Sequence, residues 1–86
     1  MAEIVDNEKG FKVIKMNRDE LYRACGGLGI CDRCNEQVDA GFYVAVLNMW
    51  LCPVCYKRWM QFAVNYPEDR EIEQRRYVYM MECLMI

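Results

Sequence analysis

The chain has 86 residues, with 11 Lys and Arg against 13 Asp and Glu, a formal net charge of −2 and 55% hydrophobic residues. Its length allows a single domain, residues 1–86, and its hydrophobic content argues against intrinsic disorder. The sequence contains no His, Ser or Thr, which excludes Ser/His and Cys/His nucleophilic catalysis and imidazole metal ligands. No apolar run approaches the roughly 18 residues that span a bilayer, so we expect no membrane partner.

The six cysteines are best explained by a reducing compartment. Residues 1–10 contain no apolar stretch typical of a secretory signal, and we expect them to form a frayed or weakly tied terminus in a cytoplasmic protein. Cysteines stay reduced in that compartment. Paired CxxC spacings therefore indicate metal or redox chemistry rather than structural disulfides.

The next segment predicts a short strand followed by a capped helix. Residues 11–16 are rich in apolar and β-branched side chains, which favours a strand. Asn17 followed by Glu20 is typical of a capping box, so we predict a helix over residues 18–25. Cys25 ends this helix. We expect it to pack near the metal loop as a small apolar residue, although a role as an alternate ligand stays open.

The middle of the chain predicts a β-hairpin followed by a helix. Residues 42–47 are dense in β-formers, and residues 50–52 are expected to form the return strand. Asn48 tolerates the positive φ of a tight turn between them. Residues 54–65 then place their apolar side chains at helical spacing, namely Cys55, Trp59, Phe62, Ala63 and the following Tyr66.

Pro67 separates this helix from a C-terminal tail. The acids that follow Pro67 suit the first turn of a new helix, which we predict over about residues 67–85. Residues 77–86 are apolar except for Glu82, so this part of the tail needs burial on nearly all sides. Tyr77-Val78-Tyr79 would also suit a strand. We expect Cys83, within this stretch, to be buried or at an interface.

Four of the cysteines form two CxxC pairs, Cys31 with Cys34 and Cys52 with Cys55, separated by 17 residues. Two thiolates three positions apart can both point inward from one turn, and two such pairs complete a tetrahedron around zinc. This spacing is typical of a zinc site. We therefore predict one Zn²⁺ ion per chain, bound by these four residues.

The residues that flank the second pair indicate a helix start. A zinc ribbon or a rubredoxin-type iron site normally places Gly after each second Cys. Asn35 can replace Gly at positive φ, but Tyr56 would be strained there. Cys52 is instead expected to be the N-cap, with Pro53 in the first helical position. Trp59, one turn beyond Cys55, should then share its face and pack over the metal site.

The order of knuckle, hairpin and ligand-bearing helix resembles the treble-clef zinc fingers. Within them, Cys52-Pro53-Val54-Cys55-Tyr56-Lys57-Arg58-Trp59 resembles the closing C-x-x-C-Y stretch of the second zinc module of a LIM domain. The resemblance covers about residues 30–66. The chain lacks the preceding zinc module of a LIM domain, because Cys25 alone cannot build one. The resemblance implies a metal-stabilised scaffold that binds another macromolecule.

We therefore expect a small zinc-stabilised α+β domain. Its zinc module covers about residues 28–66, with a strand and helix before it and the tail helix at about residues 67–85 after it. Four Cys ligands fill a structural zinc shell and leave no open position for water, so we expect no enzymatic activity.

A protein-interaction adaptor or regulatory module is the function that we favour. The apolar tail suits a protein partner or a second copy of the chain, but it could equally pack within its own monomer. Nucleic-acid binding is the alternative, and the charge opposes it: four thiolates and one Zn²⁺ ion change the formal net charge from −2 to −4. A redox protein that uses a CxxC dithiol is a third hypothesis, which the zinc-like spacing of the two pairs opposes.

Overall fold

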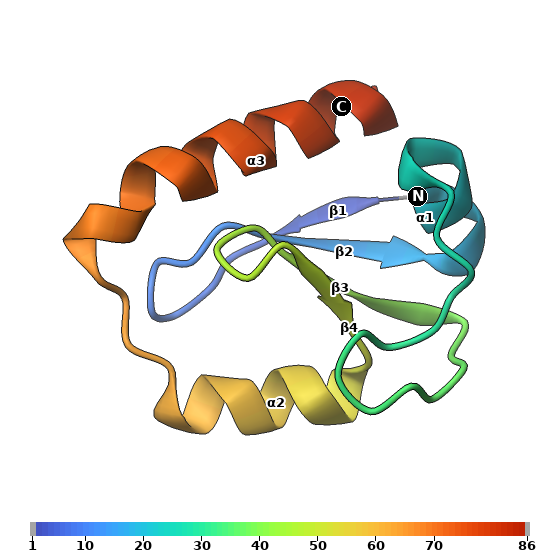
Figure 1. Cartoon of the computed structure of the whole chain (residues 1–86), viewed down its shortest axis with the longest axis horizontal. Coiled ribbons are helices and arrows are strands. Elements are labelled where there is room, and N and C mark those ends of the chain that lie inside the picture. Colours follow the sequence, from blue (N-terminus) through green and yellow to red (C-terminus); the bar gives the residue numbers. More distant parts are fainter. Residues whose placement is uncertain (1, 86) are drawn as a thin grey trace.

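The computed structural model describes residues 2–85 and shows a four-stranded antiparallel sheet with helices on both faces (Figure 1). The strands lie in the order β1-β2-β3-β4. The elements are β1 (Glu3–Val5), β2 (Val13–Asn17), α1 (Arg18–Cys25), β3 (Ala40–Val44), β4 (Met49–Leu51), α2 (Pro53–Phe62), the 3₁₀ turn η1 (Pro67–Asp69) and α3 (Arg70–Leu84). This arrangement confirms the expected α+β class.

Both faces of the sheet are buried, so the molecule has three layers. Val13, Val44 and Leu51 belong to one buried cluster, which α2 covers. Their strand neighbours, such as Tyr43 and Trp50, point the opposite way into a second cluster that α1 and α3 cover (Figure 1). Successive side chains of a strand alternate between faces, and here each set has its own helical layer.

The N-terminal segment is part of the sheet, so the expectation of a frayed or weakly tied terminus was wrong for residues 2–10; Met1 lies outside the described residues. β1 pairs antiparallel with β2, with Ile4 opposite Ile14. Asn7 in the connecting loop donates from Nδ2 to the Tyr56 hydroxyl at 2.8 Å, and its Oδ1 accepts from the backbone N–H groups of Lys9 and Phe11. This strand is hard to predict, because β1 is only three residues long and forms through pairing with another segment.

Helix α1 begins and ends as predicted. The Asn17 side chain accepts from Glu20 N–H at 2.8 Å, and the Glu20 carboxylate accepts from Asn17 N–H at 2.8 Å, which completes the capping box. Gly26 closes the helix at φ 74°, a left-handed conformation that glycine adopts without strain. Cys25, however, is exposed, so the expected packing of its side chain was wrong.

The first strand of the hairpin is shorter and the turn is longer than predicted, whereas the return strand keeps its three residues and is shifted by one. β3 ends at Val44 rather than at residue 47, and four turn residues, Ala45–Asn48, precede β4. Asn48 has the expected positive φ, 54°. Gly41 permits close packing of the two strands, because a Cβ there would lie 2.6 Å from the Leu51 carbonyl oxygen.

The two remaining helices cover opposite faces of the sheet (Figure 1). α2 ends at Phe62, before the predicted residue 65. The tail forms the helix α3, so the alternative of a strand over residues 77–79 was wrong; Ile86 lies outside the described residues. Met80 is buried in this chain's own core at 5% exposure. Within residues 2–85, no helix has the length and apolar character needed to cross a membrane.

Polar contacts also fix α3 to the sheet. The Glu73 carboxylate, buried at 4% exposure, accepts from the backbone N–H of Lys12 at 3.0 Å. Arg76 donates from Nη1 to the carbonyl oxygens of Ala45 and Val46 at 3.3 and 3.1 Å, respectively. One contact lies before β2 and the other at the β3–β4 turn, so α3 is held at two separate points.

Candidate metal centre

The four predicted cysteines come together at one end of the α2-covered cluster. Their sulfur atoms all lie within 4.8 Å of one another, and Cys34 Sγ is 3.7 Å from Cys52 Sγ. Four thiolates at the zinc bond length of about 2.3 Å would place their sulfur atoms about 3.8 Å apart in a tetrahedron. All six cysteines of the chain are free thiols. The cluster therefore has the ligand number and spacing to bind one metal ion.

The first pair is held by a tight backbone turn between Ile30 and Gln37, which form an isolated β-bridge. Asn35 N–H donates to the Cys31 carbonyl oxygen at 2.9 Å, and Asn35 takes a positive φ of 64°, as expected. Arg33 N–H points at Cys31 Sγ at 3.4 Å. The turn thus presents both sulfur atoms on one side and supplies a donor to the buried one.

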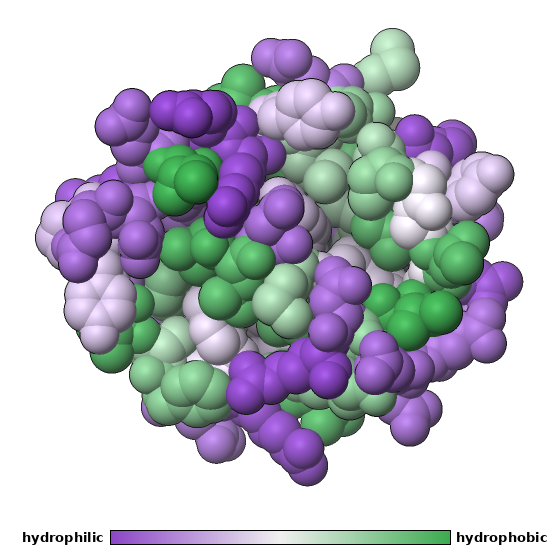
Figure 2. Space-filling view, in the orientation of Figure 1, coloured by the Kyte–Doolittle hydropathy of each residue, from purple (hydrophilic) through white to green (hydrophobic). Residues whose placement is uncertain are grey.

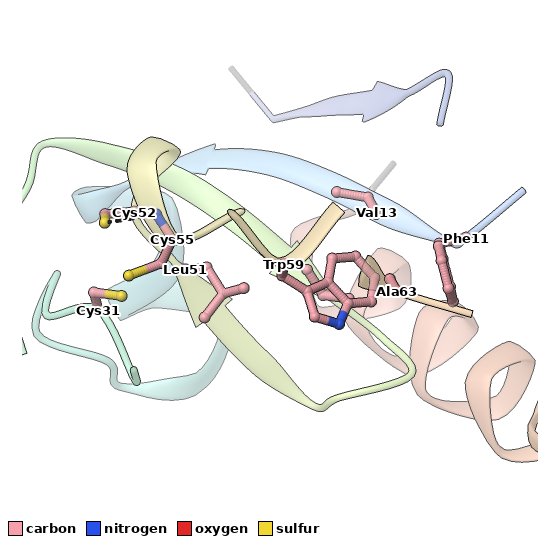
Figure 3. Packing of buried hydrophobic residues seen from close by; sticks show 9 residues of the cluster. Phe11, Val13, Cys31, Leu51, Cys52, Cys55, Trp59 and Ala63 are labelled. Carbon is pink, nitrogen blue, oxygen red and sulfur yellow. Dashed lines mark hydrogen bonds between the residues drawn. The ribbon is translucent and has the colours of Figure 1, made fainter. Parts of the chain in front are cut away.

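The second pair lies in the first turn of α2. Cys52 is the N-cap in an extended conformation, and its Sγ accepts from Cys55 N–H at 3.4 Å (Figure 3). Pro53 occupies the first helical position, where no N–H is needed. The positive end of the helix dipole therefore faces the thiol cluster and stabilises negative charge on its sulfur atoms.

Asp32 joins the two halves of the centre, a role that the sequence analysis missed. Its Oδ2 accepts from Trp50 N–H at 2.8 Å, and its own N–H donates to the Trp50 carbonyl oxygen at 3.0 Å. The first turn is thereby fixed to β4, two residues before Cys52. An Asp between two ligands is a weak signal in sequence, because a short acidic side chain more often bonds to its own turn.

The thiols of the centre differ in acidity. Burial acts to raise the pKa of Cys31, but backbone N–H donors from Cys34, Cys52 and Arg33 outweigh it and lower that pKa to about 6. Burial raises the pKa of Cys55 to about 12, and the neighbouring thiols of the cluster add to this rise. Without metal, the site therefore combines one readily ionised thiol with one held protonated at neutral pH. Metal ligation displaces such a proton, because the thiolate is the ligating form.

Three of the four cysteines of the centre are buried, and the fourth is exposed to solvent. Cys31, Cys52 and Cys55 are buried at 0%, 4% and 4% exposure, whereas Cys34 is exposed. Trp59 belongs to the same buried cluster and is only 6% exposed. Its ring lies toward the other end of the cluster, against Phe11 at a centroid distance of 4.6 Å (Figure 3).

No protein-family model, curated protein or solved structure significantly matches the chain.

The two remaining cysteines lie outside the centre. Cys25 ends α1, where its Sγ contacts the Leu21 carbonyl oxygen at 3.4 Å within the same helix. Cys83 lies near the end of α3 and is half-buried. Neither is part of the four-sulfur group among the described residues. The centre accordingly consists of the two CxxC pairs alone.

Proposed function

We propose that this chain is a non-catalytic zinc-binding module of the cytoplasm that serves as a protein-interaction adaptor or regulatory unit. The observation that carries the proposal is the set of four cysteine sulfur atoms within 4.8 Å of one another, drawn from two separate parts of the chain. An all-cysteine set in this geometry is typical of structural zinc. A reducing compartment keeps such thiols available as ligands.

The arrangement of elements supports a treble-clef-like zinc module. The first pair comes from a knuckle at residues 30–37, the β3–β4 hairpin follows, and the first turn of α2 supplies the second pair. A ribbon in which the chain turns back as a strand after Cys55 does not have this helix. The order is the one that the resemblance to the second LIM zinc module implies.

A structural role for the metal is supported by the completeness of its shell. Four protein ligands leave no coordination position for water or substrate, whereas catalytic zinc sites keep one. Zinc binding contributes about 10–16 kcal/mol in small zinc peptides, which is large beside the roughly 5–15 kcal/mol of total stability that is typical of a domain. We therefore propose that the metal stabilises the fold and performs no reaction.

Protein binding is favoured over nucleic-acid binding by charge and by burial. Zinc ligation brings the formal net charge to −4, and the exposed Arg75 lies 3.4 Å from the Glu71 carboxylate. Trp50 and Trp59 are 2% and 6% exposed, so neither indole offers a face on which a base can stack.

The redox alternative is opposed by the position of the most acidic thiol. Cys31 has the lowered pKa that a reactive dithiol would use, but its side chain is fully buried. A thiolate that attacks a substrate disulfide must be accessible. The same lowered pKa suits a metal ligand, because the thiolate is the ligating form and a metal ion would be bound inside the cluster.

Native mass spectrometry of the purified, reduced protein tests the proposal. We expect one zinc ion per chain, retained until a chelator removes it. A folded chain without stoichiometric metal, or one that carries two metal ions, would contradict the proposal. The same spectrum shows whether the chain is a monomer or a dimer. This matters because the apolar tail is a candidate surface for association with a second copy.

A further inference from the structure

A solvent-open groove lies on the face opposite α2, with a volume of about 770 Å³. Helix α3 forms one wall, the end of α1 with the following loop forms the second, and the metal knuckle forms the third. Tyr43 and Trp50 of the sheet form its floor. Figure 2, in the orientation of Figure 1, shows hydrophobic and hydrophilic side chains next to one another between α3 at the top and α2 at the bottom. The volume is in the range of ligand-binding clefts.

The groove has an apolar rim next to the metal knuckle. Leu28, Ile30 and Tyr79 all line it, and they are 66%, 41% and 64% exposed, respectively. Leu28 and Ile30 flank the start of the knuckle, whereas Tyr79 stands opposite them on α3. Large apolar side chains gathered at the edge of a cleft are typical of binding surfaces, because an occupant that covers them removes apolar area from water.

The other end of the groove, at the β3–β4 turn, is polar and cationic. Arg76 uses only Nη1 for its two bonds to turn carbonyl oxygens, so its Nε and Nη2 have no hydrogen-bond partner among residues 2–85. The Tyr43 hydroxyl donates to Asn48 Oδ1 at 2.9 Å, and Arg75 adds a second cation, shared with Glu71. A guanidinium with free donors is suited to bind a carboxylate.

The one carboxylate that lines the groove does not neutralise this cationic end. It belongs to Asp32, whose Oδ2 already accepts from Trp50 N–H on the knuckle side. We propose that the groove binds a short segment of a partner protein in which an acidic side chain lies beside large apolar side chains. The carboxylate would pair with Arg76, and the apolar side chains would cover Leu28, Ile30 and Tyr79.

A peptide segment fits better than a small molecule because the groove is open to solvent rather than enclosed. A chain can enter and leave such a groove, whereas small ligands are usually enclosed over most of their surface. The proposal rests on the proposed function as an interaction module. It adds the surface and the chemistry of the segment, and it makes peptide binding depend on the metal, because the knuckle is one wall.

Peptide selection against the zinc-loaded protein tests the proposal. A phage library of short random peptides is panned, and the selected peptides are synthesised with matched versions in which Gln or Lys replaces Glu and Asp. We expect selected peptides to combine Glu or Asp with Leu, Phe or Trp. The Gln versions should bind about tenfold more weakly, as loss of a charge-assisted contact implies, and the Lys versions more weakly still.

Matched variants locate the binding. R76Q and L28A should each weaken peptide binding by about tenfold or more, measured by fluorescence anisotropy. R58Q and V54A, which change exposed side chains of the same types on α2, should leave it unchanged. Amide NMR shifts caused by the peptide should fall on the groove. Metal content and thermal unfolding, measured on every variant, confirm that each one is folded.

Several outcomes would overturn the groove proposal. They are selection of basic peptides or of no peptide by the zinc-loaded chain, peptide shifts confined to α2, and equal losses in the control variants. Concentration-dependent shifts at the groove without peptide would instead assign it to a second copy of the chain. These outcomes can be distinguished from a failure of the proposed zinc-binding function. In that case the purified chain would lack stoichiometric zinc.

Discussion

At the scale of single residues, the centre contains four thiols that are placed to bind a metal ion and a carboxylate that positions them. Cys34 is the only exposed member of the four, so its sulfur makes little contribution to core packing. Its removal should therefore affect the fold through the metal alone. Cys25 is also exposed but lies outside the cluster, which makes it a matched control.

Replacement of Cys34 by Ser is expected to abolish stoichiometric zinc binding and cooperative unfolding. The zinc contribution of about 10–16 kcal/mol is as large as the whole stability of a typical small domain, about 5–15 kcal/mol. Metal analysis and thermal denaturation under reducing conditions measure both effects. Cys25→Ser and Cys83→Ser should keep one metal per chain. Loss of metal from Cys25→Ser would show that Cys25 is a ligand.

Asp32 provides a residue-scale test of ligand positioning. Asp32→Ala leaves the buried N–H of Trp50 without its acceptor, which should lower the free energy of unfolding by about 1–3 kcal/mol. Outer contacts of this kind typically change metal affinity by about 10- to 100-fold, and chelator competition measures it. Asp39→Ala should change neither quantity, because that carboxylate is fully exposed and 3.9 Å from Arg18. Equal effects of the two variants would refute the positioning role.

At the scale of elements, local signals were sufficient to predict where α1 and α2 begin. The capping box at Asn17 and the N-cap at Cys52 were both predicted, because each depends on residues within one turn. β1 was missed because its pairing with β2 is not encoded locally. The bond from Asp32 to Trp50 was missed for the same reason, since its partners are 18 residues apart.

Helix α2 carries the prediction that belongs to this scale. Trp59 packs against Phe11 at a centroid distance of 4.6 Å and is 6% exposed, so it attaches the helix to the sheet. Trp59→Ala should destabilise the zinc-loaded protein by about 3–5 kcal/mol in chemical denaturation. Phe62→Ala, on the exposed side of α2, should stay within about 1 kcal/mol of the parent protein. Equal losses would mean that α2 does not dock through Trp59.

At the scale of the whole molecule, the sheet couples the metal centre to the distant helices. Leu51 and Trp50 are neighbours on β4, yet Leu51 packs with the cysteines under α2 and Trp50 packs under α3. Loss of the metal would release α2 and the knuckle and expose one face of β2, β3 and β4. Those strands also form the floor for α1 and α3, so the second cluster should not survive alone.

Metal removal should therefore unfold both sides of the sheet together. The two tryptophans report on opposite faces of the sheet. Trp59 of α2 lies in the cluster on one face, and Trp50 of β4 lies in the cluster that α3 covers on the other. A chain labelled with fluorotryptophan should show two ¹⁹F resonances in NMR, and both should shift to unfolded positions at the same chelator concentration. Added zinc should restore both resonances, provided that a reductant keeps the thiols free. A native Trp50 resonance beside an unfolded Trp59 resonance would contradict this coupling and would limit the metal's role to α2 and the knuckle.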